Sequence, residues 1–154
     1  MENEISRIYG NRLRVRVCGL LHDGDRLLLV NHRLPGRDAW WAPPGGGLEF
    51  GETLVETLRR EFEEETNLSI TVGQFAFGCE YLNDPLHAIE LFFWVSRTNG
   101  LLRAGDDPEL ALISDIRYLS MNEISALPPD QTHGIFQVAR SLDALQQLKG
   151  FYRV

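Results

Sequence analysis

The sequence predicts an α/β fold in which a central mixed sheet is packed between helices, built as a single domain from residues 1–154. Strand-like and helix-like patterns follow one another in the order strands, helix, strands, helix, which is the order expected of such layers. A chain of 154 residues is the usual size of one domain and can bury a core without disulfides or structural zinc. Its 44% apolar and 24% charged residues are typical of a globular protein.

A hairpin is predicted near the beginning of the chain. Apolar and basic residues alternate over 13–17, and residues 27–30 form an apolar run after the turn signal Asp23-Gly24-Asp25. Three arginines would share one face of the first strand: Arg12, Arg14 and Arg16. That face is either solvated or a row of cations that meets ligand phosphates or, in a homodimer, a subunit partner.

A structured loop is predicted over residues 35–51, followed by a helix over 53–66. The loop segment holds three prolines and five glycines, too many for a helix or a central strand. Thr53 with Glu56 three residues later is the pattern of a capping box. Apolar residues then recur at helical spacing, at Val55, Leu58 and Phe62.

Three further strands and a second helix are predicted in the rest of the chain. Residues 70–81 and 87–96 form a second hairpin through the turn at 83–85, and 113–119 form another strand. Asp130 is expected to cap the second helix. Its apolar positions are Ile135, Val138, Leu142 and Leu145.

Charge and cysteine content exclude several classes of protein. The net charge of −7 and the pI of about 5.1 provide no basic field for a long nucleic acid. An acidic protein can still bind a small polyphosphate when divalent cations lie between its carboxylates and the phosphates. Cys18 and Cys79 show no metal-ligand or redox spacing, so we expect two reduced packing residues. Without an apolar run of about 18 residues, we expect a soluble, cytoplasmic protein that does not enter a membrane.

The helix over 53–66 is unusually acidic. Seven glutamates occur between positions 49 and 65: Glu49, Glu52, Glu56, Glu61, Glu63, Glu64 and Glu65. A helix advances by about 100° per residue, so Glu61, Glu64 and Glu65 share one face and Glu63 projects roughly opposite. Convergent carboxylates suit a hard cation such as Mg²⁺. The alternative is a solvated acidic face, because most glutamate runs are nothing more.

The segment from Gly46 to Leu68 resembles the Nudix box. It reads Gly46-x5-Glu52-x7-Arg60-Glu61-Phe62-x-Glu64-Glu65-x-Asn67-Leu68, against a glycine, a glutamate and then Arg-Glu-apolar-x-Glu-Glu-x-Gly-apolar in the family. Asn67 replaces the last glycine, and asparagine tolerates the left-handed conformation of a helix C-cap better than other non-glycine residues. The preceding Trp41-x-Pro43-Pro44-Gly45-Gly46 is also similar to the family. The resemblance implies the Nudix fold, an α/β/α sandwich with a central mixed sheet.

The resemblance also implies an activity. A Nudix hydrolase would be a pyrophosphohydrolase that uses Mg²⁺, or alternatively Mn²⁺, to cleave the diphosphate linkage of a nucleoside diphosphate bound to another moiety, by attack of water at phosphorus. Glu61, Glu64 and Glu65 would be the metal ligands, Arg60 would orient Glu61, and Glu52 would support the cluster. The alternative is a Nudix-fold module that binds a nucleotide without turnover. Retention of Arg60 and the three glutamates favours the enzyme.

The general base stays open at the level of the sequence, since in this family its position varies. Glu109, on a loop before the last predicted strand, is one candidate, and Glu61 or Glu52 are others. Glu80, Glu90 or a water activated by the metal alone are further candidates.

Substrate contacts are expected around the glycine-rich loop. Arg33 and Arg37 are candidates for phosphate or base contacts, and Gly46 for close approach. Trp41 or its neighbour Trp40 is a candidate for stacking on a base, the alternative being that at least one of them packs against the sheet. The histidines form no ligand spacing, so we expect structural or surface roles for them, although His87 together with Glu90 would also fit the border of a substrate cleft.

Overall fold

The protein is described here by a computed structural model that covers residues 4–33, 36, 38–103 and 113–154. Arg37 and Glu109, two predicted site residues, lie outside the described residues. In the first part of the chain the elements are α1 (Glu4–Tyr9), β1 (Arg12–Leu20), β2 (His22–Asp23), β3 (Arg26–His32), β4 (Trp41–Ala42), β5 (Gly45–Gly47) and α2 (Leu54–Thr66). They are followed by β6 (Ser69–Asn83), β7 (Leu86–Asn99), β8 (Ile113–Ser120), α3 (Met121–Ala126), the 3-10 turn Pro129–Gln131, α4 (Ile135–Val138), α5 (Leu142–Gln147) and β9 (Phe151–Arg153).

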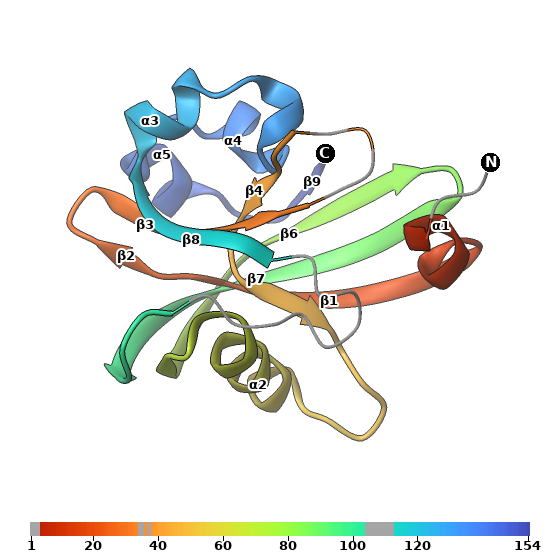
Figure 1. Ribbon diagram of the computed structural model, residues 1–154, viewed down its shortest axis with the longest axis horizontal. Coiled ribbons are helices and arrows are strands. Elements are labelled where there is room, and N and C mark those ends of the chain that lie inside the picture. Colours follow the sequence, from red (N-terminus) through yellow and green to blue (C-terminus); the bar gives the residue numbers. More distant parts are fainter. Residues whose placement is uncertain (1–3, 34–35, 37, 104–112) are drawn as a thin grey trace.

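Two sheets form the centre of the fold (Figure 1). The five-stranded sheet has the order β5-β1-β7-β6-β9, and it is mixed because β1 runs parallel to β7 while β6 runs antiparallel to β7. The four-stranded sheet joins β2, β3, β4 and β8 through antiparallel pairs. The predicted mixed α/β fold is therefore confirmed.

Helices cover both sides of the sheets. In Figure 1, α2 lies below them and α3, α4 and α5 lie above. Strand β3 shows the reason in its sequence, because Leu28 packs into the core under α2 whereas Leu27 and Leu29 pack into the core under the C-terminal helices. All three side chains are fully buried. A strand that points apolar side chains to both faces must be covered on both faces.

Helix α2 begins and ends as the sequence predicts. The Thr53 side chain accepts a hydrogen bond from the Glu56 backbone N–H, and the Glu56 carboxylate accepts one from the Thr53 N–H, so the capping box is present. Asn67 closes the helix in the left-handed conformation with φ of 62°, which explains why asparagine can replace glycine there. Leu58 and Phe62 anchor the helix in the core.

The hairpin of residues 70–81 and 87–96 is confirmed as β6 and β7, and β8 contains the strand predicted over 113–119. The predicted loop over 35–51 contains two short strands, β4 and β5, and β5 lies at a sheet edge. Glycine in a strand often marks a site where another group approaches closely, and both Gly45 and Gly46 have such neighbours.

Two predictions about pairing and helix length were wrong. Residues 13–17 lie in β1, which pairs with β5 and β7, and the partner of β3 across the Asp23-Gly24 turn is the short β2. The single C-terminal helix is two short ones, because Ala139 has extended dihedral angles and Ser141 caps α5. Asp130 lies in the 3-10 turn, and the N-cap of α4 is Gly134.

Both cysteines are buried free thiols, as predicted. In the described part of the chain, no helix is long and apolar enough to cross a membrane.

Candidate active site

A cavity of about 910 Å³ opens on the face of the five-stranded sheet that also carries the core under the C-terminal helices. Its floor includes Arg14 and Arg16 of β1 and Glu90 of β7. In the register of the sheet, Arg16 lies beside Glu90. Each is two residues before a core residue of its own strand, Cys18 or Phe92, so all four side chains point to the same face of the sheet. This face of the sheet is thus apolar where the C-terminal helices cover it and charged in the neighbouring part that borders the cavity.

The glutamates of α2 reach this cavity around the edge strand β5. Glu61, Glu64 and Glu65 all border the cavity, although α2 packs on the opposite side of the sheet. The backbone N–H of Gly45 donates to Glu65 Oε1 at 2.8 Å. A Cβ placed on Gly46 would lie 2.3 Å from Glu61 Cδ and Oε1. Glycine at position 46 is therefore required to leave room for the Glu61 carboxylate.

Arg60 ties the acidic residues together. Its guanidinium donates to both oxygens of Glu52 at 2.9 Å, to Glu61 Oε1 at 2.9 Å and to Glu64 Oε2 at 3.3 Å. The hydrogen bond from Arg60 holds the pKa of Glu52 below its ordinary value. Thr57 also donates to Glu52. Glu52 does not border the cavity, and its connection to the cavity glutamates runs through Arg60.

Glu61 is the electrostatically strained member of the cluster. Burial raises its pKa to about 7, against the attraction of Arg60 and together with the repulsion from Glu64. Only 9% of Glu61 is exposed. A buried carboxylate beside a second carboxylate is stabilised in its charged form by an added cation.

The chemistry of these donors fits a divalent cation. Hard cations prefer carboxylate oxygens, and Glu61, Glu64 and Glu65 present three such groups to one cavity. Within the described residues, however, no group of three or more Asp, Glu, His or Cys side chains is arranged to hold a metal ion as it stands. Arg60 occupies the space between Glu61 and Glu64 by bonding both, so side-chain rotation would have to bring the three carboxylates together.

The two neighbouring glutamates, Glu63 and Glu64, point as the helical geometry predicts. Glu63 is exposed and does not border the cavity, whereas Glu64 is half-buried and does.

A second cluster of polar side chains, Arg16, Glu90 and His133, joins three parts of the chain that are far apart in the sequence. They are β1, β7 and the segment before α4. Arg16 Nη1 donates to Glu90 Oε2 at 2.5 Å, and His133 Nε2 lies 2.7 Å from Glu90 Oε1. The Ile135 N–H donates to His133 Nδ1 at 3.0 Å, so Nδ1 is unprotonated and Nε2 is the donor to Glu90. Burial alone would raise the pKa of Glu90, but His133 and Arg16 hold it below its ordinary value.

The sequence indicated Glu90 as a candidate general base and, with His87, as a candidate for the border of a cleft, and it placed Arg16 in the arginine row. It carried no signal for the Arg16–Glu90–His133 group, because its members are 43 and 74 residues apart and their spacing matches no motif.

Comparison with known proteins decides the family. A family model described as the NUDIX domain matches residues 10–142. The chain belongs to the Nudix family. It is 31% identical over 107 residues to an ADP-ribose pyrophosphatase of Methanocaldococcus jannaschii, a match that covers 68% of this chain and 63% of that protein. It is 33% identical over 82 residues to the phosphatase NudJ of Escherichia coli K12, covering 53% of this chain and 44% of that protein.

The chain therefore spans less than two thirds of the length of these curated relatives. The fold is also that of a solved NUDIX hydrolase from Nitrosomonas europaea, with a TM-score of 0.72 and 20% identity over 82% of this chain and 85% of that one.

Outside the Nudix box, several residues expected to contact the substrate do not border the cavity. Trp41 is buried in the core, and of the two tryptophans it is Trp40 that borders the cavity. A shift of one residue along an extended segment turns a side chain to the other face. Arg33 is exposed and does not border the cavity. Of the arginine row in β1, Arg14 and Arg16 border the cavity and Arg12 does not.

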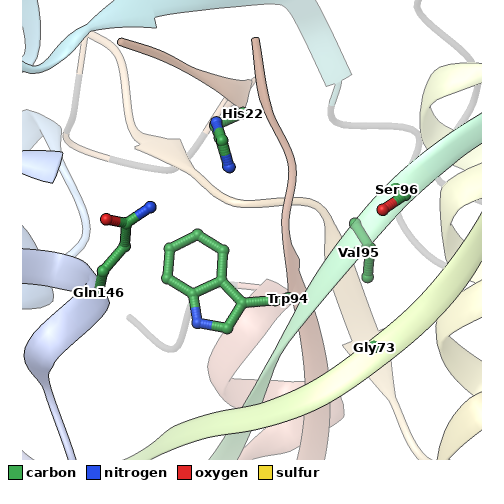
Figure 2. A pocket seen from close by; sticks show the side chains of 6 residues that line it. All are labelled: His22, Gly73, Trp94, Val95, Ser96 and Gln146. Atoms are coloured by element: carbon green, nitrogen blue, oxygen red, sulfur yellow. The ribbon is translucent and has the colours of Figure 1, made fainter. Parts of the chain in front are cut away.

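A smaller hollow of about 330 Å³ lies elsewhere on the molecule (Figure 2). Trp94 forms its centre, with His22 edge-on at 5.9 Å between ring centroids and Gln146 of α5 nearby. No carboxylate lines it among the described residues. Among these two cavities, only the larger is bordered by glutamates of the Nudix box.

Proposed function

We propose that this chain is a divalent-metal-dependent pyrophosphohydrolase that cleaves the diphosphate linkage of a nucleoside diphosphate bound to another group, by attack of water at phosphorus. One observation carries the proposal: in a member of the Nudix family, Glu61, Glu64 and Glu65 border one cavity with Arg14 and Arg16. When bound by these glutamates, Mg²⁺ or Mn²⁺ would neutralise phosphate charge and lower the pKa of a water molecule.

The protein groups themselves have distinct tasks in this scheme. Arg14 and Arg16 supply positive charge beside the carboxylates, which favours a diphosphate over an uncharged ligand. Arg60 holds Glu61, and Glu52 holds Arg60, so the orientation of the cluster is fixed by hydrogen bonds on the protein side. The acidic wall then requires a cation before a phosphate can approach.

The hydrogen bonds of the structure reduce the number of candidates for the general base. Glu52 is engaged by Arg60, Glu80 by His87 at 2.8 Å, and Glu90 by Arg16 and His133. A carboxylate that is already paired is less free to accept a proton from water. Glu61 is also bonded by Arg60, at 2.9 Å, so the same argument counts against it. We therefore favour Glu109 or a water activated by the metal alone over the paired glutamates.

A substrate panel tests the proposal. Nucleoside triphosphates, nucleotide sugars, dinucleoside polyphosphates and ADP-ribose are incubated with Mg²⁺ or Mn²⁺, and products ending in phosphate are measured. ADP-ribose belongs in the panel because one relative is named an ADP-ribose pyrophosphatase. We expect turnover of at least one compound, loss of turnover with chelator, and ¹⁸O from labelled water in a product phosphate. Binding without turnover under both metals would instead support a nucleotide-binding module.

A further inference from the structure

Arg16 lies in the middle strand of three and has carboxylates on both sides. Its strand β1 runs between β5 and β7, and Arg16 is opposite Gly47 of β5 on one side and Glu90 of β7 on the other. From α2, Glu65 reaches β5 and accepts a hydrogen bond from the Gly45 N–H at 2.8 Å. Arg16 therefore lies between a glutamate of its own sheet and the glutamates expected to bind metal.

The charges of these carboxylates act on Arg16. Burial alone would lower the pKa of Arg16, but nearby negative charges raise it above its ordinary value. Those of Glu90, Glu65 and Glu61 are among them. Without Glu90, Arg16 would be drawn towards Glu65 and Glu61. An arginine bonded to those two side chains would compete with a metal ion for their oxygens.

The hydrogen bonds show that Arg16 is held by Glu90 instead. Nη1 of Arg16 donates to Glu90 Oε2 at 2.5 Å, and the guanidinium makes no other hydrogen bond within the described residues. Nε and Nη2 are further donors of a guanidinium. Among the described residues, Thr132 Oγ1 is the one inaccessible side-chain N or O atom without a partner, so both nitrogens of Arg16 retain accessible surface. Because Arg16 borders the cavity, they can donate to phosphate oxygens there.

His133 fixes the other oxygen of the Glu90 carboxylate. Its Nε2 donates to Glu90 Oε1 at 2.7 Å, and its Nδ1 accepts from the Ile135 N–H at 3.0 Å. Both nitrogens of the ring are thus engaged, which sets the orientation of the ring. His133 and Glu90 are each 3% exposed. The carboxylate that holds Arg16 is therefore itself held at both oxygens.

We propose that Glu90 and His133 are positioning residues, which hold Arg16 on the cavity floor so that its guanidinium binds a phosphate group and does not bond the metal-binding glutamates. The inference rests on the proposed function, because that function supplies the phosphate and the metal ion. Both consequences can nevertheless be measured as binding, without turnover.

The first test measures phosphate binding with a ligand that resists hydrolysis. Methylenediphosphonate has a P–C–P bridge in place of the diphosphate oxygen, and calorimetry in Mg²⁺ buffer gives its affinity. We expect Arg16→Met to weaken binding about tenfold or more, because charge-assisted hydrogen bonds are lost. Unchanged affinity of this variant, or no binding to the unsubstituted protein, would overturn the inference.

Two substitutions of His133 separate positioning from support of the fold. The amide nitrogen of glutamine can take the place of Nε2, so His133→Gln keeps a donor to Glu90. The amide oxygen of asparagine can take the place of Nδ1, so His133→Asn keeps the acceptor for the Ile135 N–H and loses the bond to Glu90. We expect His133→Asn to weaken methylenediphosphonate binding severalfold and His133→Gln to preserve it. Equal affinities of the two variants, or weaker binding by His133→Gln, would assign His133 to the fold and refute its positioning role.

The third test measures whether Glu90 keeps Arg16 away from the metal site. Electron paramagnetic resonance gives the affinity for Mn²⁺ in the absence of any phosphate ligand. Glu90→Gln should weaken Mn²⁺ binding severalfold, since Arg16 is then drawn to the metal-binding glutamates. Arg16→Met should strengthen Mn²⁺ binding more in the Glu90→Gln background than in the unsubstituted protein. Equal effects in the two backgrounds would show that Glu90 does not restrain Arg16.

Two combinations of results distinguish this inference from the proposed hydrolysis. If Arg16→Met and His133→Asn weaken binding as expected but no compound of the substrate panel is hydrolysed, the positioning role stands and the hydrolase proposal fails. If a compound is hydrolysed but both variants bind methylenediphosphonate as the unsubstituted protein does, the hydrolase proposal stands and the positioning role is refuted.

Discussion

Replacing Gly46 by alanine tests how the Nudix box builds the site, because the new methyl group would meet Glu61 directly. The added Cβ would lie 2.3 Å from Glu61 Cδ and Oε1 and 2.6 Å from Oε2. Ordinary contact begins near 3.4 Å, so the carboxylate must move by about 1 Å. Gly46 is not among the residues with positive φ, so alanine meets no backbone penalty. The effect is therefore exerted through the Glu61 side chain.

The magnitude follows from that displacement. Overpacking of this kind costs about 1–3 kcal/mol of folding stability. A shift of about 1 Å in a catalytic group lowers kcat on the order of a hundredfold. The displacement also breaks the 2.9 Å hydrogen bond from Arg60 to Glu61. Thermal melts and kcat at saturating metal, on a substrate found by the panel, measure the two effects.

Gly47→Ala is the matched control on the same strand. Its Cβ would meet only Arg14 Nη2, at 3.5 Å, which is ordinary contact. We expect this variant to keep its Tm within about 1 °C and most of its activity. Truncation of Glu61 in a Gly46→Ala, Glu61→Ala double variant should restore stability but not activity. Equal activity of the Gly46→Ala and Gly47→Ala variants would refute the reasoning that Gly46 makes room for Glu61.

Three further predictions use neighbouring or paired groups. Glu64→Gln should lower kcat by orders of magnitude and Glu63→Gln should change it little, since only Glu64 borders the cavity; equal losses in steady-state assays would contradict the assigned faces. Glu90→Gln leaves the Arg16 cation uncompensated and should cost about 3 kcal/mol in denaturant unfolding. Because the folded-state pKa of Glu90 is below its ordinary 4.5, this difference should be complete above that pH and shrink as the pH falls towards the lowered pKa. Thr53→Ala removes the capping box and should cost about 1 kcal/mol, with no change in kcat at saturating metal.

The parts of the fold that the sequence predicted are those governed by local interactions. The capping box of Thr53 and Glu56, the left-handed Asn67 and the β6–β7 hairpin each depend on residues close together in the chain. The parallel pairing of β1 with β7 joins residues more than 70 positions apart, and no local pattern encodes the partner of a strand. The sequence also could not show which of the two neighbouring tryptophans faces the cavity, because Trp40 and Trp41 are equally aromatic. Only the register of β4 distinguishes them, and it is Trp40 that borders the cavity.

The hydrogen bonds of Arg60 connect Glu52 with the cavity glutamates, although Glu52 itself does not border the cavity. Glu61, Glu64 and Glu65 on one helix face repel one another, and burial adds to that cost at Glu61. The positive charge of Arg60 offsets this repulsion. An arginine that bonded all of these glutamates strongly, however, would compete with a metal cation for the same carboxylate oxygens. Glu52 prevents this by engaging Arg60 through two hydrogen bonds of 2.9 Å, shorter than the 3.3 Å contact with Glu64. The weakest contact of Arg60 with these glutamates is thus with a cavity carboxylate, and Glu64 can be released while Arg60 still holds Glu61.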